Sequence, residues 1–301
     1  MIPDFQSLML PFLKITGDKN EHSTNEVIDT LAKANNLTEE ELQQLLPSGK
    51  QRTFANRVHW TKAHLKMSCL LQDTKRSHFK ITERGIDVLK QNPEVINIKF
   101  LRQFQEYLEF TGKSSPPANT DNKEETSISE TPEEQLEAGY LKIRKTLEQE
   151  LLSKLKTINP SFFEKIVVEL LVKMGYGGSI QDAGQAIGKS GDEGIDGIIK
   201  EDKLGLDVIY IQAKRWEGVV GRPELQKFVG ALAGQRAKKG VFITTSNFTK
   251  EAVAYSAQMD TKIVLIDGEK LSQFMIDYNL GVSIQSTYEI KKIDSDYFEE
   301  E

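Results

Sequence analysis

The sequence contains little cysteine and little histidine, and each shortage excludes a kind of site. Its one cysteine, Cys69, rules out a disulfide framework and a cysteine-based zinc site. The four histidines are His22, His59, His64 and His78. Since all of them lie in the N-terminal half, the C-terminal half has no histidine for Ser-His or Cys-His catalysis or for an HNH-type nuclease.

The chain also lacks a long apolar run. The longest candidate, Ile166–Val172, is interrupted by Glu169 and is much shorter than the roughly 18 residues of a membrane span. The first residues carry no basic stretch ahead of their short apolar run, which makes a poor signal peptide. We therefore expect no membrane segment and a cytoplasmic protein.

The overall charge gives no sign of nucleic-acid binding. The 301 residues, of which 38% are hydrophobic, suffice for two domains with real cores. Lys and Arg number 39 against 45 Asp and Glu, so the net charge is −6 and the pI is near 5.5. Nucleic-acid-binding domains usually have a pI above about 9. Only the local distribution of charge can therefore support such a function.

The middle of the chain, residues 112–132, reads as a flexible acidic linker. It has no aromatic residue, three prolines and many Ser, Thr and acidic residues, so it cannot bury enough apolar surface to offset its ordering entropy. Apolar residues at spacings of three and four predict a connecting helix over 133–157. We expect a first domain at 1–111, a second at 158–291, and an acidic tail at 292–301.

The first domain is expected to consist of helices followed by a β-hairpin. A helix begins at Ser23 or Thr24, and Thr38–Glu41 forms a capping box for another. A longer amphipathic helix is predicted over Thr53–Leu71, and two short strands follow, Leu70–Gln72 and His78–Ile81. The side chains expected on the inner face of that helix are Phe54, Val58, Ala63, Leu65 and Leu70. This order is typical of a winged helix-turn-helix domain.

The same region carries the strongest positive charge in the chain. Between Ser48 and Arg84, nine Lys or Arg accompany two acids. A helix can enter the major groove while basic residues on a wing reach phosphates, so we expect DNA binding here. The candidate DNA-binding residues are Lys50, Arg52, Arg57, Lys62, Lys66, Lys75, Arg76 and Lys80. The alternatives are a merely solvated basic helix, or a winged helix that contacts protein. The nearby histidines are expected on the helix or wing surface.

The second domain alternates helices and strands, which predicts an α/β fold with a central mixed sheet. A helix over Phe162–Met174 is followed by a glycine-rich stretch. Within that stretch, Gly184–Ser190 resembles a phosphate-binding P-loop, but Ala183 stands where the first glycine is needed, so we expect no ATP binding. Two strands then bring Asp196 next to Asp207–Lys214. Strand alternation places Gln212 and Lys214 on one face.

This juxtaposition supports phosphodiester hydrolysis. Asp196, an amide oxygen from Gln212 and a further carboxylate from Glu164 can hold Mg²⁺ through hard oxygen ligands. The metal ion would polarise the phosphodiester and activate water, and Lys214 would stabilise the developing charge. Asp192 and Glu193 are alternative carboxylates. The plain alternative is that Asp196 is a turn residue and Lys214 a surface cation.

The surrounding residues give the pattern its specificity. They are Phe163-Glu164 on a helix, GDEGIDGII at 191–199, VIYIQAKRW at 208–216, and the stretch from Val220 through IDGEKLSQFM at 266–275. This set resembles the Mrr family of restriction endonucleases, within the PD-(D/E)xK nuclease superfamily. The N-terminal half also looks like the Mrr winged-helix domain, so the resemblance is nearly full length.

The resemblance implies a type IV, methylation-directed endonuclease that cuts DNA bearing methylated adenine or cytosine. It assigns catalytic roles to Asp196, Gln212, Lys214 and Glu164, and metal binding to Asp196, Gln212 and Glu164. Gln212 departs from the acidic residue of the wider superfamily, although the Mrr branch carries Gln there. Since double-strand cleavage needs two active sites, we expect a homodimer or larger. Two other functions remain open, a DNA-binding regulator with a degenerate nuclease fold and a nuclease for branched DNA.

Overall fold

The structure, a computed structural model, describes residues 1–75, 77–112, 129–177, 194–202, 204–294 and 297. Arg76, most of the expected linker, the P-loop-like stretch, and Asp192 with Glu193 therefore lie outside the described residues. The chain divides into two compact units. Unit 1 is Met1–Leu141 with the C-terminal residues from Lys291, and unit 2 is Lys142–Ile290. None of the described helices combines the length and apolar composition needed to span a bilayer.

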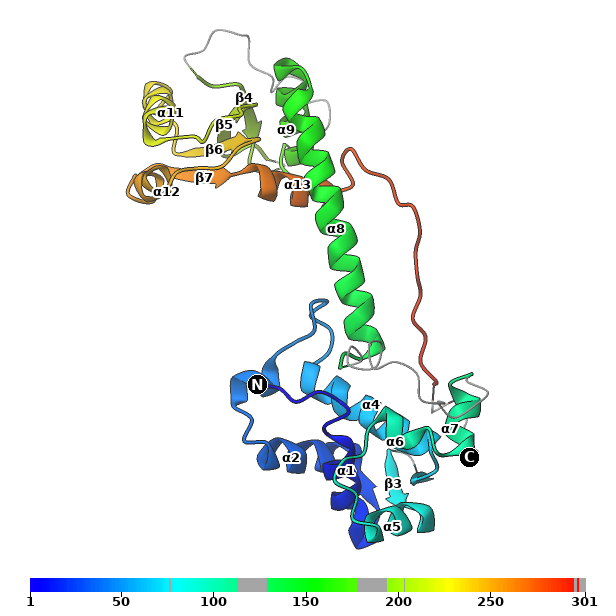
Figure 1. The fold of residues 1–301 in the computed structure, drawn as a ribbon. Coiled ribbons are helices and arrows are strands. Elements are labelled where there is room, and N and C mark those ends of the chain that lie inside the picture. The colour runs from blue at the N-terminus through cyan, green and yellow to red at the C-terminus, as the bar shows by residue number, and fades with distance from the viewer. Residues whose placement is uncertain (76, 113–128, 178–193, 203, 295–296, 298–301) are drawn as a thin grey trace. The chain divides into compact units, whose positions relative to one another are not determined.

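Unit 1 is a set of helices around a three-stranded antiparallel sheet of order β1-β3-β2 (Figure 1). Its elements are α1 (Met9–Ile15), η1 (Thr16–Asp18), β1 (His22–Ser23), α2 (Thr24–Ala34), α3 (Glu39–Gln43), α4 (Thr53–Met67), β2 (Leu71–Lys75), β3 (His78–Ile81), α5 (Glu83–Lys90), α6 (Ile98–Leu101) and α7 (Gln105–Phe110). Thr38 forms the predicted capping box, and Ser23, one of the two predicted starts of α2, forms a capping box as well. The hairpin β2-β3 follows α4 directly.

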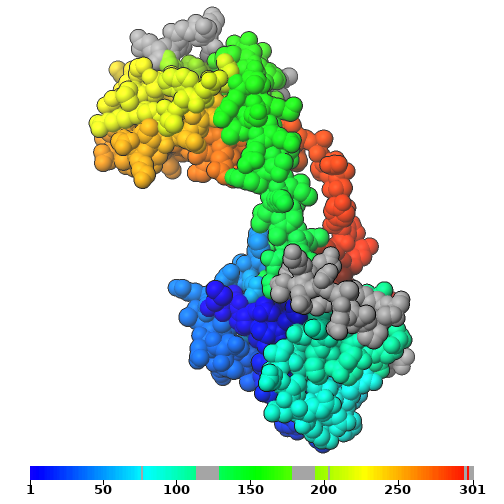
Figure 2. Space-filling view, viewed as in Figure 1, coloured from blue at the N-terminus to red at the C-terminus, as the bar shows by residue number. Residues whose placement is uncertain are grey.

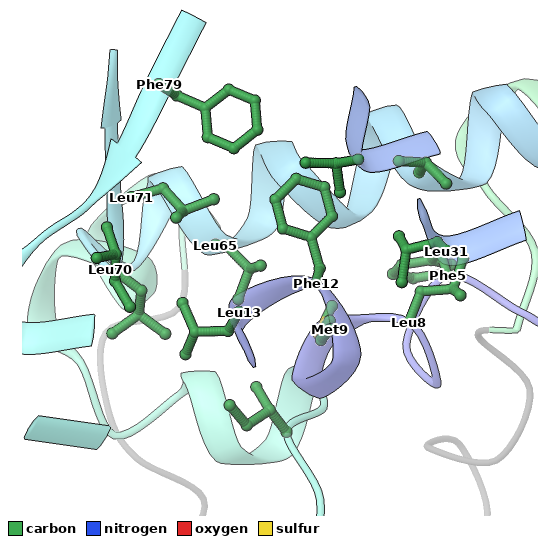
Figure 3. Close-up of a cluster of buried hydrophobic side chains, with 14 of the residues drawn as sticks. Phe5, Leu8, Met9, Phe12, Leu13, Leu31, Leu65, Leu70, Leu71 and Phe79 are labelled. Carbon is green, nitrogen blue, oxygen red and sulfur yellow. The ribbon is translucent and has the colours of Figure 1, made fainter. Parts of the chain in front are cut away.

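The core of unit 1 forms where α1 and α4 meet the hairpin (Figure 3). The rings of Phe12 and Phe79 lie side by side in it, with centroids 5.5 Å apart. α4 contributes Phe54, Val58 and Leu65, all buried as predicted. The expectation that Ala63 faces inward is wrong, because Ala63 is partly exposed on the opposite side of the helix. Thr61 takes the inner position instead, where its hydroxyl donates to the Phe5 carbonyl at 2.7 Å.

Unit 2 contains a four-stranded mixed sheet of order β4-β5-β6-β7, which confirms the predicted α/β class. β4 (Gly197–Lys200) pairs antiparallel with β5 (Val208–Lys214), and β6 (Lys239–Thr244) and β7 (Lys262–Ile266) continue in parallel. The helices are α8 (Pro132–Thr157), whose first part belongs to unit 1, α9 (Pro160–Lys173), α11 (Arg222–Gly234), α12 (Lys250–Ala257) and α13 (Gly268–Asp277).

Two apolar clusters cover the two faces of this sheet. On one face, Ile211 and Ala213 of β5 pack among side chains of α9, α13 and the end of α8. On the other face, Phe242 of β6 packs edge-on against Phe228 of α11, with ring centroids 5.6 Å apart. Figure 2 shows α11 and α12 side by side as one continuous surface over this second face. The alternation predicted for β5 is therefore realised, with Gln212 directed away from Ile211 and Ala213.

His64 is an interior residue, contrary to the expectation of a surface histidine. Its ring stacks on Phe5 with centroids 5.2 Å apart, and its Nδ1 lies 2.9 Å from the Tyr107 hydroxyl. Burial lowers the pKa of His64 to about 4, because the protonated ring would lose its hydration. The folded state therefore holds this histidine neutral.

This burial predicts a pH dependence of the stability of unit 1. The pKa of His64 rises from about 4 when folded to about 6.5 when unfolded, so the unfolded chain binds more protons between these values. The contribution of neutral His64 to the stability of unit 1 is complete above about pH 6.5 and is lost as the pH falls toward 4. We expect the unfolding free energy of the wild type, minus that of His64→Phe, to fall as the pH is lowered from 7 to 5, because only the wild type loses the contribution of His64.

The measurement can follow unit 1 alone, because Trp60 and Trp216 are the two tryptophans and lie in different units. In a Trp216→Phe background, urea unfolding monitored by Trp60 fluorescence reports on unit 1. A difference that stays constant between pH 7 and pH 5 would show that His64 is not held neutral by burial.

Candidate active site and nucleic-acid interface

Asp196 is held against the end of β5 by two hydrogen bonds. Its backbone N–H donates to the Ile211 carbonyl at 2.8 Å, and its Oδ2 accepts from the Ala213 backbone N–H at 2.8 Å. Asp196 lies immediately before β4 rather than within it as expected. Burial raises the pKa of Asp196, although the Ala213 hydrogen bond and the Lys214 charge partly offset this. The bond to Ala213 occupies one carboxylate oxygen and leaves the other available.

Gln212 reaches the same place from β5. Only 5% of its surface is exposed, and its amide forms no hydrogen bond with any other residue that the structure describes. Gly194, with φ at +102°, passes close to this amide: a Cβ there would lie 3.5 Å from Nε2. The chain ahead of Asp196 thus approaches Gln212 through a backbone conformation that favours glycine. The amide oxygen of Gln212 is thus not taken up by a described partner, and such an oxygen can serve as a ligand of a hard cation.

Glu164 adds a second carboxylate from α9, the helix that packs on β4 and β5. Burial raises the pKa of Glu164, and the negative charge of Asp196 raises it further. The two carboxylates are thus close enough to repel each other. That Glu164, Asp196 and Gln212 act as one site stays a prediction, which the effect of Asp196 on the pKa of Glu164 supports.

Lys214 ends β5 and is held by an acid that the sequence reasoning missed. Its Nζ donates to Glu224 Oε2 at 2.6 Å and lies 4.8 Å from the centre of the Trp216 ring. Glu224 also accepts from Lys227 at 2.7 Å. The hydrogen bonds from Lys214 and Lys227 lower the pKa of Glu224, so this carboxylate is ionised. The sequence feature that could have indicated this partner is Glu224, which follows Pro223 in the first turn of α11. An acid at that position is equally typical of an ordinary helix start.

The donors present fit a hard divalent cation. Two carboxylates whose pKa values are raised by burial, that of Glu164 also by the charge of Asp196, and the amide oxygen of Gln212 are oxygen ligands, which suit Mg²⁺. Within the described ranges, no group of three or more His, Cys, Asp or Glu residues could hold a metal ion. Glu164 and Asp196 supply two carboxylates, and Gln212 would have to add its amide oxygen to them for a cation to be held here. Asp192 and Glu193 lie outside this set.

The candidate DNA-binding residues of unit 1 divide into two groups. Arg57 belongs to the first, which is tied into the fold. Its guanidinium donates to the carbonyl oxygens of Ile2 and Pro3 at 2.9 and 3.1 Å and pairs with Glu134 at 2.8 Å. With 18% of its side chain exposed, Arg57 joins the N-terminal segment to the start of α8.

Three lysines of the basic stretch also have partners within unit 1. Lys62 donates to Thr24 Oγ1 at 3.0 Å and lies over the Phe79 ring, and burial lowers the pKa of Lys62. Lys66 pairs with Asp73 across α4 and β2, and Lys75 pairs with Glu21 at 3.0 Å. The exposed pairs of Lys66 and Lys75 could open at little cost, whereas Lys62 is part of the packing.

The second group consists of Lys50, Arg52 and Lys80. Lys50 and Arg52 are exposed just before α4, and Lys80 lies partly exposed on β3. Their side chains form no ion pair with the residues that the structure describes. These three are thus the cations most available to a phosphate backbone. Arg76, on the predicted wing tip, lies outside the described residues.

Comparisons with known families confirm the resemblance seen in the sequence. Residues 155–275 match the family Mrr_cat, described as "Restriction endonuclease". Residues 5–91 match the family Mrr_N, described as "Mrr N-terminal domain". The two matches correspond to the nuclease-like unit and to the helical unit that carries α4 and the hairpin.

A curated relative matches over the whole length. The chain is 37% identical over 312 residues to the "Type IV methyl-directed restriction enzyme EcoKMrr" of Escherichia coli (strain K12), covering 99% of each chain. Among solved structures, it is similar to MspJI restriction endonuclease in complex with a 27-mer oligonucleotide (18% identity, 70% of this chain, 53% of the other, TM-score 0.34). It is also similar to restriction endonuclease FokI (12% identity, 91% of this chain, 70% of the other, TM-score 0.29). Both TM-scores are too low to bear on the fold.

The two groups of cations predict opposite mutational effects. Arg57→Met should destabilise unit 1 by roughly 2 kcal/mol, because the four hydrogen bonds that its guanidinium donates to Ile2, Pro3 and Glu134 are lost. Lys50→Met should change stability by less than about 0.5 kcal/mol, but should reduce the salt dependence of DNA binding by about one counterion. Urea unfolding and DNA binding at several salt concentrations check both. A stable Arg57→Met protein with weakened DNA binding would reverse the assignment.

Proposed function

Because the chain belongs to the Mrr family of restriction endonucleases, we propose that it hydrolyses phosphodiester bonds of methylated double-stranded DNA in a Mg²⁺-dependent reaction. The observation that supports this proposal is the hydrogen bond from the Ala213 N–H to Asp196, which holds this carboxylate at the strand that carries Gln212 and Lys214. Glu164 is near enough for the charge of Asp196 to raise its pKa. Such a set of residues suits cleavage of a phosphodiester without any histidine. Unit 1 would select the DNA and unit 2 would cut it.

The chain's own residues have distinct tasks in this proposal. Glu164, Asp196 and Gln212 would hold Mg²⁺ through oxygen atoms. A bound Mg²⁺ ion would supply the Lewis acidity that polarises the phosphodiester and lowers the pKa of water. The Ala213 N–H fixes the orientation of the Asp196 carboxylate, so its free oxygen is aimed before any ligand arrives.

Lys214 would stabilise the negative charge that builds up on the phosphate during attack by water. Its ammonium is already ordered by Glu224 and by the ring of Trp216. Glu224 acts on the reaction only through Lys214, as a positioning residue. Its second bond, to the exposed Lys227, balances the added negative charge.

The choice of methylated DNA is supported by the full-length relative, whose name describes a methyl-directed enzyme. Unit 1 supports DNA recognition through its topology, in which α2, α4 and the hairpin β2-β3 follow one another as in a winged helix-turn-helix domain. We further propose a homodimer or larger assembly, because each copy offers one cleavage site and a double-strand break needs two.

The central prediction concerns methylation. Purified protein with Mg²⁺ should cut plasmid prepared in a methylating host and spare the same plasmid prepared without methylation. Asp196→Asn keeps the size of the side chain but removes its charge, and should lower the cleavage rate by at least about a hundredfold. Agarose gels of time courses give both results.

Three results would contradict this function. Equal cutting of both plasmids would refute the methylation specificity, and a fully active Asp196→Asn protein would refute the site. Preferred cutting of synthetic four-way junctions over methylated duplex would instead indicate a nuclease for branched DNA. Mn²⁺ in place of Mg²⁺ provides a check that any inactivity is not a matter of metal choice.

A separate prediction tests the positioning role of Glu224. Glu224→Gln should lower kcat roughly 10- to 100-fold, because the ammonium of Lys214 loses the charge that orders it. The affinity for DNA, measured with EDTA in place of Mg²⁺, should stay unchanged. Lys227→Met is the matched control, since it removes the exposed partner of Glu224 and should leave kcat near the wild-type value. A loss of DNA affinity without a change in kcat would contradict this role.

A further inference from the structure

A pocket of about 470 Å³ lies on the surface of unit 1, over α4 and beside the first turn of α8. It is not part of the candidate active site, which belongs to unit 2. Its exposed surface is mostly apolar, although five of the nine lining residues are polar or charged: Gln51, Arg52, Asn56, His59 and Glu133. The lining residues used in the argument are Arg52, Ala55, His59, Trp60, Ala63 and Glu133.

The pocket occupies the side of α4 that faces away from the core. Phe54, Val58 and Leu65 define the buried side of this helix. At 100° per residue, Ala63 and His59 point in the opposite direction. In a winged helix-turn-helix domain, the outward face of the helix that precedes the wing is the one that enters the major groove. The pocket is therefore located where base edges would pass.

Small side chains create the hollow. Ala55 and Ala63 stand two turns apart on the outward side, and neither reaches beyond its Cβ. Trp60 forms a wall, and its indole Nε1–H donates to the Glu133 carboxylate, which fixes the ring. A recognition helix that read only unmodified bases would be expected to carry long polar side chains at these positions. Apolar contact is what a methyl group on a base edge requires.

Glu133 gives the pocket a hydrogen-bonding preference. One of its oxygens accepts from Trp60, and the other is free to accept from a ligand. The amino groups of cytosine and adenine are donors in the major groove, whereas thymine presents an acceptor beside its methyl group. The carboxylate would therefore favour methylated cytosine or methylated adenine and would disfavour thymine.

We propose that this pocket is the methyl-reading site of the protein, and that it receives the major-groove edge of a base carrying both a methyl group and an amino group. The apolar wall accepts the methyl group, and Glu133 accepts the amino N–H. Arg52, exposed at the rim, supplies the positive charge that attracts the DNA backbone. This inference rests on the proposed function, because it names the residues through which methylated DNA is chosen.

Both features are needed, since either alone would fail on ordinary DNA. An apolar surface by itself would bind the methyl group of every thymine. An acceptor by itself would bind the amino group of every unmodified adenine and cytosine. An apolar wall combined with a hydrogen-bond acceptor distinguishes a base that carries both a methyl and an amino group from all four unmodified bases.

The test compares affinities for three pools of one set of DNA fragments: unmodified, with 5-methylcytosine in place of cytosine, and with N6-methyladenine in place of adenine. Full-length protein is used with EDTA, so that no strand is cut, and fluorescence anisotropy gives Kd. The wild type should bind at least one modified pool about tenfold more tightly than the unmodified pool. The preferred pool identifies which methylated base the pocket reads.

The variants Ala63→Leu and Ala55→Leu fill the hollow and should reduce this preference to less than about twofold, with affinity for the unmodified pool retained. Glu133→Gln should also reduce the preference for the modified pool, but by strengthening binding to the unmodified pool, because an amide N–H can donate to the acceptor oxygen of thymine. Ala138→Leu, an exposed alanine of α8 outside the pocket, is the matched control and should keep the wild-type preference.

The outcomes separate the pocket from the function. If the wild type prefers a modified pool and both leucine variants prefer it equally, the pocket is refuted while the proposed function stands. If the wild type binds all pools alike with EDTA, the pocket is refuted, and if it also cuts all of them alike when Mg²⁺ replaces EDTA, the methylation specificity is refuted as well. Retained binding to the unmodified pool shows that each variant is folded, so a lost preference counts for the pocket.

Discussion

The candidate active site depends on the pair of hydrogen bonds that join Asp196 to β5. Because the Asp196 N–H binds the Ile211 carbonyl and its carboxylate binds the Ala213 N–H, the start of β4 has one register against β5. Gln212 and Lys214 lie in β5, so the register between β4 and β5 fixes their positions relative to Asp196. A slip of one residue would send both side chains to the opposite face of the sheet. The register of β4 against β5 therefore sets the geometry of the candidate site.

Much of this arrangement could be predicted from the sequence, because it rests on local periodicity. Alternation in β5 separates Gln212 from Ile211 and Ala213, and the helix and strand order gives the mixed sheet. The contacts of Arg57, His64 and Lys214 could not be predicted in this way. Their partners are distant in the sequence, or ambiguous like Glu224, and only the folded chain brings them together. Tertiary packing likewise decides that Ala63 faces outward.

The distribution of charge shows why the chain average misleads. The net charge of −6 includes acids that neutralise nearby cations, such as Glu134 beside Arg57 and Glu224 beside Lys214. Several cations of the basic stretch from Ser48 to Arg84 likewise have internal partners, and among the described candidates Lys50, Arg52 and Lys80 are left for a polyanion. A protein with a modest number of free cations binds DNA weakly without specific contacts. In the proposed function, selectivity would come from base-edge contacts, which the proposed pocket would supply.

Gln212 has a physical advantage over a third carboxylate at its position. The pKa values of Asp196 and Glu164 are already raised by burial, and that of Glu164 also by its neighbour's charge. An acidic residue at 212 would add repulsion in a buried place and would favour protonation of one ligand. The neutral amide avoids this cost but binds a cation less strongly. The phosphate of bound DNA would supply the missing negative charge, so metal binding and DNA binding would reinforce each other. An enzyme with such a site would hold its metal ion firmly only when its substrate is in place.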